Sequence, residues 1–283
     1  MIKKIIFFSC AVALFSCNSN TPNNVSVSDT TKIDTTKKMQ KSEPINDNAD
    51  FKFTTLVINI PSPFEILTII PKSGISYNKS LINSTENESK YITTTKKGLN
   101  YGSYVVDLVY LSLNEQFSDV KKYFITSRNL AKSLGCAESF DKIAGSRLEK
   151  NIDKKDTINR VMNQIYTEMD KYLRSNDQIL SATQILVGSW IESQYITVSL
   201  LKVQNKNKDN EALFQQVSYQ NFTSQKLVEL FKEYENEKDF KPVMKGVKEL
   251  DKIYSGIKQG EISKATLDKL YTKLSEVRGL IVK

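Results

Sequence analysis

The stretch INRVMNQIYTEMDKYL at residues 158–173 decides the fold class. Its apolar side chains recur at intervals of three and four residues, and an α-helix with 3.6 residues per turn places them all on one face. The stretch therefore predicts an amphipathic helix that packs its apolar face against other helices. The members of this face are Ile158, Val161, Met162, Ile165, Tyr166, Met169, Tyr172 and Leu173.

The same spacing, together with capping signals, predicts helices along most of the chain. SPFE at residues 62–65 offers Ser62 as an N-cap, proline at the first helical position and glutamate at N3, so a helix is expected from there to Ile70, where Pro71 stops it. Further helices are expected over about 101–114, 118–134, 137–150, 177–203, 211–221, 224–236, 241–257 and 264–280.

Strand signals are few. FKFTTLVINI at residues 51–60 alternates in part, which favours a short strand or an extended segment lying on the helices. A lone strand would have no partner. The sequence therefore predicts an all-α helical bundle of roughly eight to ten helices.

The amino terminus has the layout of an export signal. Two lysines precede an apolar stretch over residues 5–15, which is too short to span a bilayer stably. The stretch ends in LFSC at residues 14–17, which resembles the lipobox of bacterial lipoproteins. This resemblance implies that residues 1–16 are removed as a signal peptide and that Cys17 carries the lipid that anchors the chain to a bilayer. The other reading is an ordinary secretory signal in which Cys17 is incidental.

The rest of the chain divides by composition. Residues 17–50 are rich in Asn, Ser, Thr, Asp and Lys, and they cannot bury enough apolar surface to offset their ordering entropy, so a disordered tether is expected. Residues 51–283 are enough for a substantial helical domain. We expect a core over 51–204 and a C-terminal helical extension over 205–283.

Composition also excludes several kinds of chemistry. The chain has no histidine, which removes the usual general base and the imidazole metal ligands. Cys136 is the one thiol left once Cys10 leaves with the signal peptide and Cys17 is lipidated, so we expect a buried structural thiol. We expect no cofactor, no metal and no catalytic residue. The formal charge is +8, but the sequence has no arginine-rich arm. Because the expected export would also separate the protein from cytoplasmic nucleic acid, nucleic-acid binding is not expected.

Two segments repeat one layout. YGSYVVDLVY at 101–110 and VGSWIESQY at 187–195 each contain Gly-Ser-aromatic, then a carboxylate, then a tyrosine. A glycine inside a helix costs about 1 kcal/mol relative to alanine, which suggests that a close helix approach compensates for it. A duplicated helical-hairpin core, packed about a pseudo-twofold axis, would produce this echo.

The echo has two readings. In the structural one, the glycines let two central helices cross and the aromatic rings fill the core. In the functional one, a ligand groove lies between the helices 101–114 and 177–203. Buried carboxylates need partners, and Arg147, Arg160 or a ligand amine would supply them. Whether the two carboxylates face one cavity or are neutralised by basic side chains distinguishes the readings. The groove would be lined by Tyr104, Asp107, Trp190, Glu192 and Tyr195.

Four short motifs, PSP at 61–63, YGSYxxD at 101–107, NxxxxD at 151–156 and GSWxE at 188–192, resemble a group of uncharacterised helical lipoproteins from Bacteroidota. The resemblance spans most of residues 53–203 and implies no activity. In lipoproteins of that phylum, acidic residues soon after the cysteine look like the signal for surface display, and NSNT at 18–21 has none. The resemblance therefore implies a protein that faces the periplasm.

The function that we expect from these features is a non-catalytic binding or scaffold module of the cell envelope. Its partners would be the lipid bilayer, through acylated Cys17, and an envelope protein. Residues 226–258 mix both charges with aromatic side chains, a composition that suits a partner surface and equally an ordinary solvated helical hairpin. The alternative is a small-ligand binding or sensing domain. A carboxylate-dependent hydrolase would require two carboxyl groups about 5 to 9.5 Å apart in an open cleft.

Overall fold

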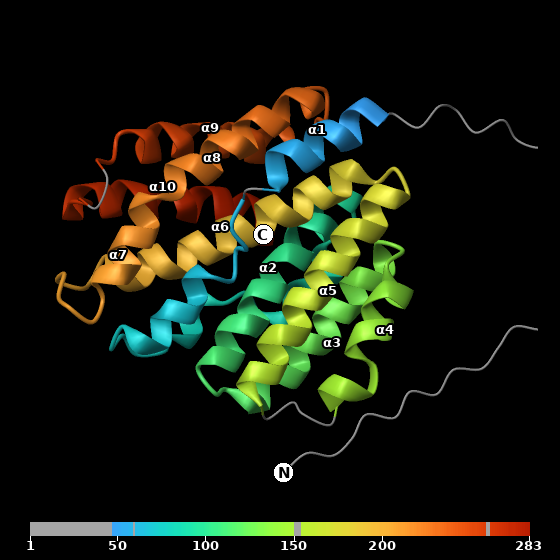
Figure 1. The fold of residues 1–283 in the computed structure, drawn as a ribbon, viewed down its shortest axis with the longest axis horizontal. Helices are drawn as coiled ribbons and strands as arrows, with labels where there is room; N and C mark the ends of the chain where they lie inside the picture. The colour runs from blue at the N-terminus through green and yellow to red at the C-terminus, as the bar shows by residue number, and fades with distance from the viewer. Residues whose placement is uncertain (1–46, 59, 150–153, 259–260) are drawn as a thin grey trace, which may run out of the picture. The chain divides into compact units, whose positions relative to one another are not determined.

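The computed structural model describes residues 47–58, 60–149, 154–258 and 261–283. These residues form helices joined by short connections, with no strand among them (Figure 1), and the expected all-α bundle is confirmed. The expected signal peptide, Cys17 and most of the tether lie outside the described residues. The helices are α1 (Asp47–Val57), η1 (Ile66–Lys72), η2 (Lys79–Leu81), η3 (Thr85–Lys90), α2 (Thr94–Leu113), α3 (Phe117–Ser133), α4 (Ala137–Glu149), α5 (Lys155–Ser175), α6 (Ile179–Leu201), α7 (Glu211–Ser218), α8 (Gln220–Leu230), η4 (Phe231–Tyr234), α9 (Lys241–Ser255) and α10 (Lys264–Val282), where η denotes a 3₁₀-helix.

The first helix corrects an expectation. Residues 51–57, expected to be a strand or an extended segment, belong to α1. Phe53 and Leu56 are three residues apart, which puts both on one helical face, and both are buried where α1 packs against α8 and α6. The segment therefore forms a helix despite its partly alternating apolar and polar residues. A helix buries these two side chains, and the described residues contain no strand with which the segment could pair.

The segment after the first helix also differs from its prediction. Instead of an α-helix ending at Ile70, η1 is a 3₁₀-helix that continues through Pro71 to Lys72. Its backbone bonds join residues three apart, as in the bond from the Leu67 amide to the Phe64 carbonyl at 3.1 Å. The Ser62 hydroxyl accepts a hydrogen bond from the Phe64 amide at 3.4 Å, so the serine stabilises the turn that precedes the helix.

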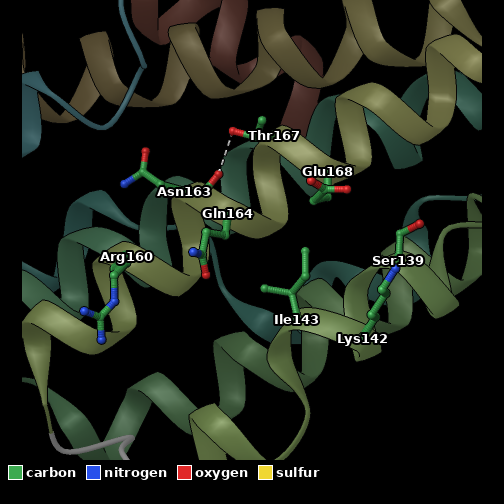
Figure 2. Close-up of a pocket in the computed structure, with 8 residues that line it drawn as sticks. All are labelled: Ser139, Lys142, Ile143, Arg160, Asn163, Gln164, Thr167 and Glu168. Carbon is green, nitrogen blue, oxygen red and sulfur yellow. Dashed lines mark hydrogen bonds between the residues drawn. The ribbon is translucent and has the colours of Figure 1, made fainter. Parts of the chain in front are cut away.

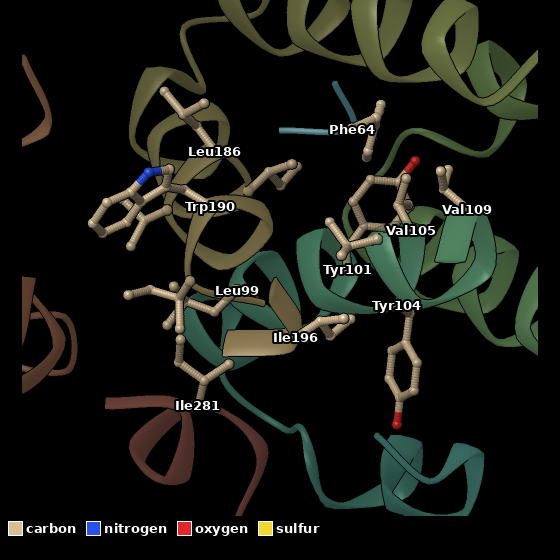
Figure 3. Packing of buried hydrophobic residues seen from close by; sticks show 14 of the residues in the cluster. Phe64, Leu99, Tyr101, Tyr104, Val105, Val109, Leu186, Trp190, Ile196 and Ile281 are labelled. Atoms are coloured by element: carbon tan, nitrogen blue, oxygen red, sulfur yellow. The ribbon is translucent and has the colours of Figure 1, made fainter. Parts of the chain in front are cut away.

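Two long helices form the centre of the fold. Every residue of α6 from Ser181 to Leu201 is buried except Tyr195, and α2 is buried from Leu99 to Ser112. A helix that is apolar on all sides needs neighbours all round. Here α2 and α6 pack on one another, α3 and α5 cover α2, and α10 covers α6. Side chains from α2, α6 and α10, with Phe64, fill this core (Figure 3).

The apolar face predicted at residues 158–173 lies in the core. Ile158, Val161, Met162, Ile165, Met169 and Leu173 are all buried on α5, and its two tyrosines are partly buried. The carboxyl-terminal helices belong to the same compact unit as the rest of the described chain. Within the described residues, no helix combines the length and apolar character that crossing a bilayer requires.

Candidate functional site

The two Gly-Ser-aromatic motifs meet in the structure. Gly102 of α2 lies against Ser189 of α6, and Gly188 of α6 lies against Leu99 of α2. A Cβ on Gly188 would stand 2.9 Å from Leu99 Cα and closer still to the Leu99 carbonyl, and a Cβ on Gly102 would stand 2.7 Å from the Ser189 nitrogen. Only glycine allows these two backbones to approach so closely.

The contacts also fix the direction of the two helices. Gln184 donates a hydrogen bond to Thr95 near the start of both helices, and Gly188 meets Leu99 further along. Both contacts advance along the two helices in the same direction, so α2 and α6 run parallel, with the two motifs side by side and Gly102 against Ser189. A hairpin partner is seen for α2, which packs on α3, whereas α6 packs next on α10. The structural reading of the echo therefore holds at the crossing.

One turn beyond the crossing, each helix contributes a carboxylate to the interior. Asp107 of α2 and Glu192 of α6 are both fully buried. Arg278 of α10 binds Glu192 with both ends of its guanidinium group: Nε lies 2.8 Å from Oε2 and Nη2 lies 2.7 Å from Oε1. Nη2 also donates to the Leu81 carbonyl at 3.0 Å. This is a bidentate, charge-assisted pair, the strongest form of such a contact.

Asp107 is held differently. Its Oδ2 accepts a hydrogen bond from the Asn83 amide at 2.9 Å, and its Oδ1 has no partner in the described part of the chain. Burial raises the pKa of Asp107 well above its ordinary value, and the nearby Glu192 carboxylate raises it further, while Arg278 and the Asn83 amide act in the opposite direction. Burial and the neighbouring carboxylate thus favour the protonated form of Asp107 more than water favours it in a free aspartate.

Tyrosine and asparagine side chains surround the pair. Asn83 donates to the Tyr91 hydroxyl at 2.9 Å, and Tyr123 donates to the Asn83 carbonyl at 2.7 Å. Tyr104 donates to the Ser84 carbonyl at 2.7 Å. Burial raises the pKa of Tyr104 and Tyr123, so both stay neutral donors. These bonds satisfy polar groups that would otherwise be costly to bury.

Polar side chains near the acid pair also bind the last carbonyls of α10. The last carbonyls of a helix have no partner within it. Here Asn100 donates to the Ile281 carbonyl at 2.8 Å, Tyr91 donates to the Val282 carbonyl at 3.1 Å, and Lys96 reaches the Leu280 carbonyl at 2.6 Å. Asn100 and Lys96 of α2, together with Tyr91 just before α2, thus cap α10, the helix that carries Arg278.

The five residues expected to line a groove are packed side chains and do not share one cavity: Trp190 lies against Tyr254, on another side of the helix pair from Tyr104 (Figure 3). Tyr104 and Asp107 are fully buried, and Trp190 is 2% exposed and donates to Gln220 at 2.9 Å. Tyr195 is partly exposed, stacks on Tyr271, and lies beneath the Arg278 guanidinium, 4.4 Å from the ring centroid. The hollow next to Trp190 measures about 20 Å³, room for about one water molecule.

The basic partner was not among those expected. Arg160 lies on α5 in a surface hollow, and the side chain of Arg147 lies outside the described residues. Arg278 was missed because it is 86 residues from Glu192. A signal was available: Arg278 follows Val277 on the apolar stripe of the last helix, and an arginine there needs an internal acid.

Two larger hollows lie on the surface. One, of about 610 Å³, lies between α4 and α5, and Figure 2 shows Lys142 and Ile143 on its α4 side and Arg160, Gln164 and Glu168 on its α5 side. The other, of about 630 Å³, lies along the start of α9 and is lined largely by lysines. Each is large enough for a ligand or for a protruding side chain of a partner. No protein-family model, curated protein or solved structure matches this chain.

Proposed function

We propose that this chain is a lipid-anchored module of the cell envelope that faces the periplasm and binds a partner without catalysis. The observation that carries the proposal is the closure of the acid pair. Asp107 and Glu192 are fully buried, and Glu192 is neutralised by Arg278. The carboxylates that a ligand groove or a hydrolase would have used are instead buried in the fold. We therefore infer that the residues that bind a partner lie on the outer surface.

The closed pair also argues against the hydrolase reading. A carboxylate pair that cleaves a glycosidic bond must reach its substrate in an open cleft. A buried acid whose neighbour is bound by arginine offers neither access nor a free base. The proposed anchor rests on the lipobox-like LFSC at residues 14–17, and it leaves the folded domain free to meet its partner near a membrane.

The anchor is tested by Cys17→Ala, with Cys10→Ala as a matched control inside the signal. We expect Cys17→Ala to abolish incorporation of labelled palmitate and to move the protein from the membrane fraction to the soluble fraction, while Cys10→Ala changes neither. Retention of Cys17→Ala in the membrane would refute the anchor. Protease treatment of intact cells should leave the protein uncut if it faces the periplasm.

The binding role is tested by cross-linking in living cells, followed by purification and mass spectrometry. One dominant envelope protein that cross-links reproducibly is the expected result. The same experiment is repeated with an Arg278→Met variant, which disturbs the core. Loss of the cross-linked partner in this variant would mean that binding depends on the folded surface.

A small-ligand role has its own observation in the hollow between α4 and α5. Lys142 and Arg160 bring positive charge to it, and Glu168 brings negative charge. A ligand with both charges, such as an amino acid, would match this lining. An amino-acid library screened by thermal shift, with Arg160→Ala as the comparison, tests this second candidate. A shift that persists in Arg160→Ala would remove the hollow from consideration.

A further inference from the structure

A groove lined by lysines runs along the start of α9, the helix marked near the top of Figure 1. We call it the lysine groove. Its volume of about 630 Å³ is comparable to that of a ligand pocket. It is lined by Glu235, Lys238, Lys241, Pro242, Met244, Lys245 and Lys248.

The groove carries unbalanced positive charge. Lys238, Lys241 and Lys245 are exposed, and none has an ion-pair partner within the described residues. Lys248 lies 3.7 Å from Glu235, near the outer limit of an ion pair. Four ammonium groups therefore face one carboxylate, and the field of the groove favours an anionic partner.

The acidic residues of α9 are bound first to neighbouring helices, although Glu249 also feels the charge of Lys245. Glu249 lies 2.7 Å from the ammonium group of Lys273 on α10. Asp251 accepts a hydrogen bond from the Ser224 hydroxyl of α8 at 2.7 Å. The acids of α9 thus help to hold α8, α9 and α10 together, while Lys241, Lys245 and Lys248 line the groove.

The spacing of the lysines matches a helical ligand. Lys241, Lys245 and Lys248 are four and three residues apart, so they follow each other at about 6 Å and about 4.5 Å along the axis of α9. Carboxylates at the same intervals on a second helix would lie opposite them. The exposed Pro242 adds apolar surface to the groove, whereas Met244 lines it with 3% of its surface exposed.

Other anionic partners fit less well. A single phosphate or carboxylate would fill a small part of about 630 Å³. A bilayer surface is flat, so it would contact the exposed lysines without filling the hollow between them. A polyanionic polymer has no apolar part to cover the exposed Pro242.

We propose that the lysine groove binds an acidic amphipathic helix of a partner protein. The inference rests on the proposed binding function and names the chemistry of the partner. Such a helix would place its carboxylates against the lysines and a neighbouring apolar side chain against Pro242, which is the helix-in-groove mode of recognition.

The test uses the mature chain from residue 17 onward with Cys17→Ser, and a labelled synthetic peptide of about 18 residues, which is about five helical turns. The peptide carries glutamates at three- and four-residue spacing beside leucines. We expect saturable binding by fluorescence anisotropy at physiological salt. The triple variant Lys241→Glu, Lys245→Glu, Lys248→Glu should weaken binding by about tenfold or more, because three attractive pairs become repulsive.

The matched control reverses three exposed lysines of α3, in the variant Lys121→Glu, Lys122→Glu, Lys132→Glu. It changes net charge equally, and binding should stay within about twofold because charges beyond a Debye length of about 8 Å are screened. Circular dichroism verifies that both variants fold. No saturable binding, or an equal loss in both variants, would overturn the proposal. The proposal would also be overturned if binding to vesicles containing phosphatidylglycerol required the groove lysines while binding to the peptide did not. None of these outcomes affects the separate test of Cys17.

Discussion

The guanidinium group of Arg278 and the carboxylate of Glu192 join helices α10 and α6 in the interior, with Nε 2.8 Å from Oε2 and Nη2 2.7 Å from Oε1. The carboxylate is fully buried, and the arginine side chain keeps 13% of its surface exposed. Such a pair contributes little net stability relative to apolar side chains, but the loss of one partner leaves a buried charge unpaired. This asymmetry is directly measurable.

Arg278→Met should lower the free energy of unfolding by about 3 to 5 kcal/mol, because Glu192 remains buried without its cation. Urea denaturation of the mature chain measures the change. Arg128→Met is the matched control: its pair with Asp141 lies on the surface, so the cost should stay within about 1 kcal/mol. Adding Glu192→Gln to Arg278→Met should restore part of the loss. Equal losses for Arg278→Met and Arg128→Met would contradict the buried pair.

Asp107→Asn should flatten the pH dependence of stability. The pKa of Asp107 is raised in the fold by burial and then by Glu192. Above the unfolded value of about 4, the unfolded chain releases this proton while the folded chain keeps it, so stability falls with rising pH by at most about 1.4 kcal/mol per unit until the folded pKa is reached. Asparagine keeps the bond from Asn83 and carries no such penalty.

The measurement for Asp107 is urea denaturation of both proteins between about pH 4 and pH 8, a range that begins near the ordinary aspartate pKa. The advantage of Asp107→Asn should grow with pH. Glu192 and Arg278 face the same site, as do Tyr104 and Tyr123, but each is present in both proteins and cancels to first order. A constant difference across the range would mean that Asp107 is ionised in the fold.

Gly188→Ala should destabilise the protein by at least about 2 kcal/mol, because the new Cβ overlaps the Leu99 backbone and two central helices must separate. Gly279→Ala is the control. Nothing lies within 4 Å of a Cβ at that position of α10, so alanine should add about 0.5 to 1 kcal/mol through helix propensity. Thermal unfolding distinguishes the opposite signs, and a harmless Gly188→Ala would show that the crossing is not tight.

Local features of the fold were predictable, because they depend on residues near one another in sequence. Ser263 caps α10 by accepting a hydrogen bond from the Thr266 amide, and Gly135 ends α3 with a φ of 79°, as glycine at that position predicts. The crossing at Gly102 and Gly188 was one of two readings. By contrast, the helix expected from residue 118 begins at Phe117, after Gln116, whose side chain makes no capping hydrogen bond.

What the sequence did not reveal is tertiary in origin. The strand-like pattern of residues 51–57 becomes a helix because α8 and α6 offer a surface for Phe53 and Leu56. The partner of Glu192 lies 86 residues away, and no periodic pattern connects the two. The backbone amide of Asn83, which holds Asp107, lies in an irregular segment that carries no signal of its role.

Cys136 should react slowly in the folded protein and rapidly once the protein unfolds. The thiol is fully buried, and burial raises its pKa to about 11. At pH 8 about one thiol in a thousand would be ionised, and the thiolate is the reactive form. In the mature chain with Cys17→Ser it is the one remaining cysteine, so iodoacetamide labelling followed by mass spectrometry reports on it alone. Labelling in urea at the same pH should be faster by orders of magnitude, whereas equal rates in both conditions would place Cys136 at the surface and contradict a structural role.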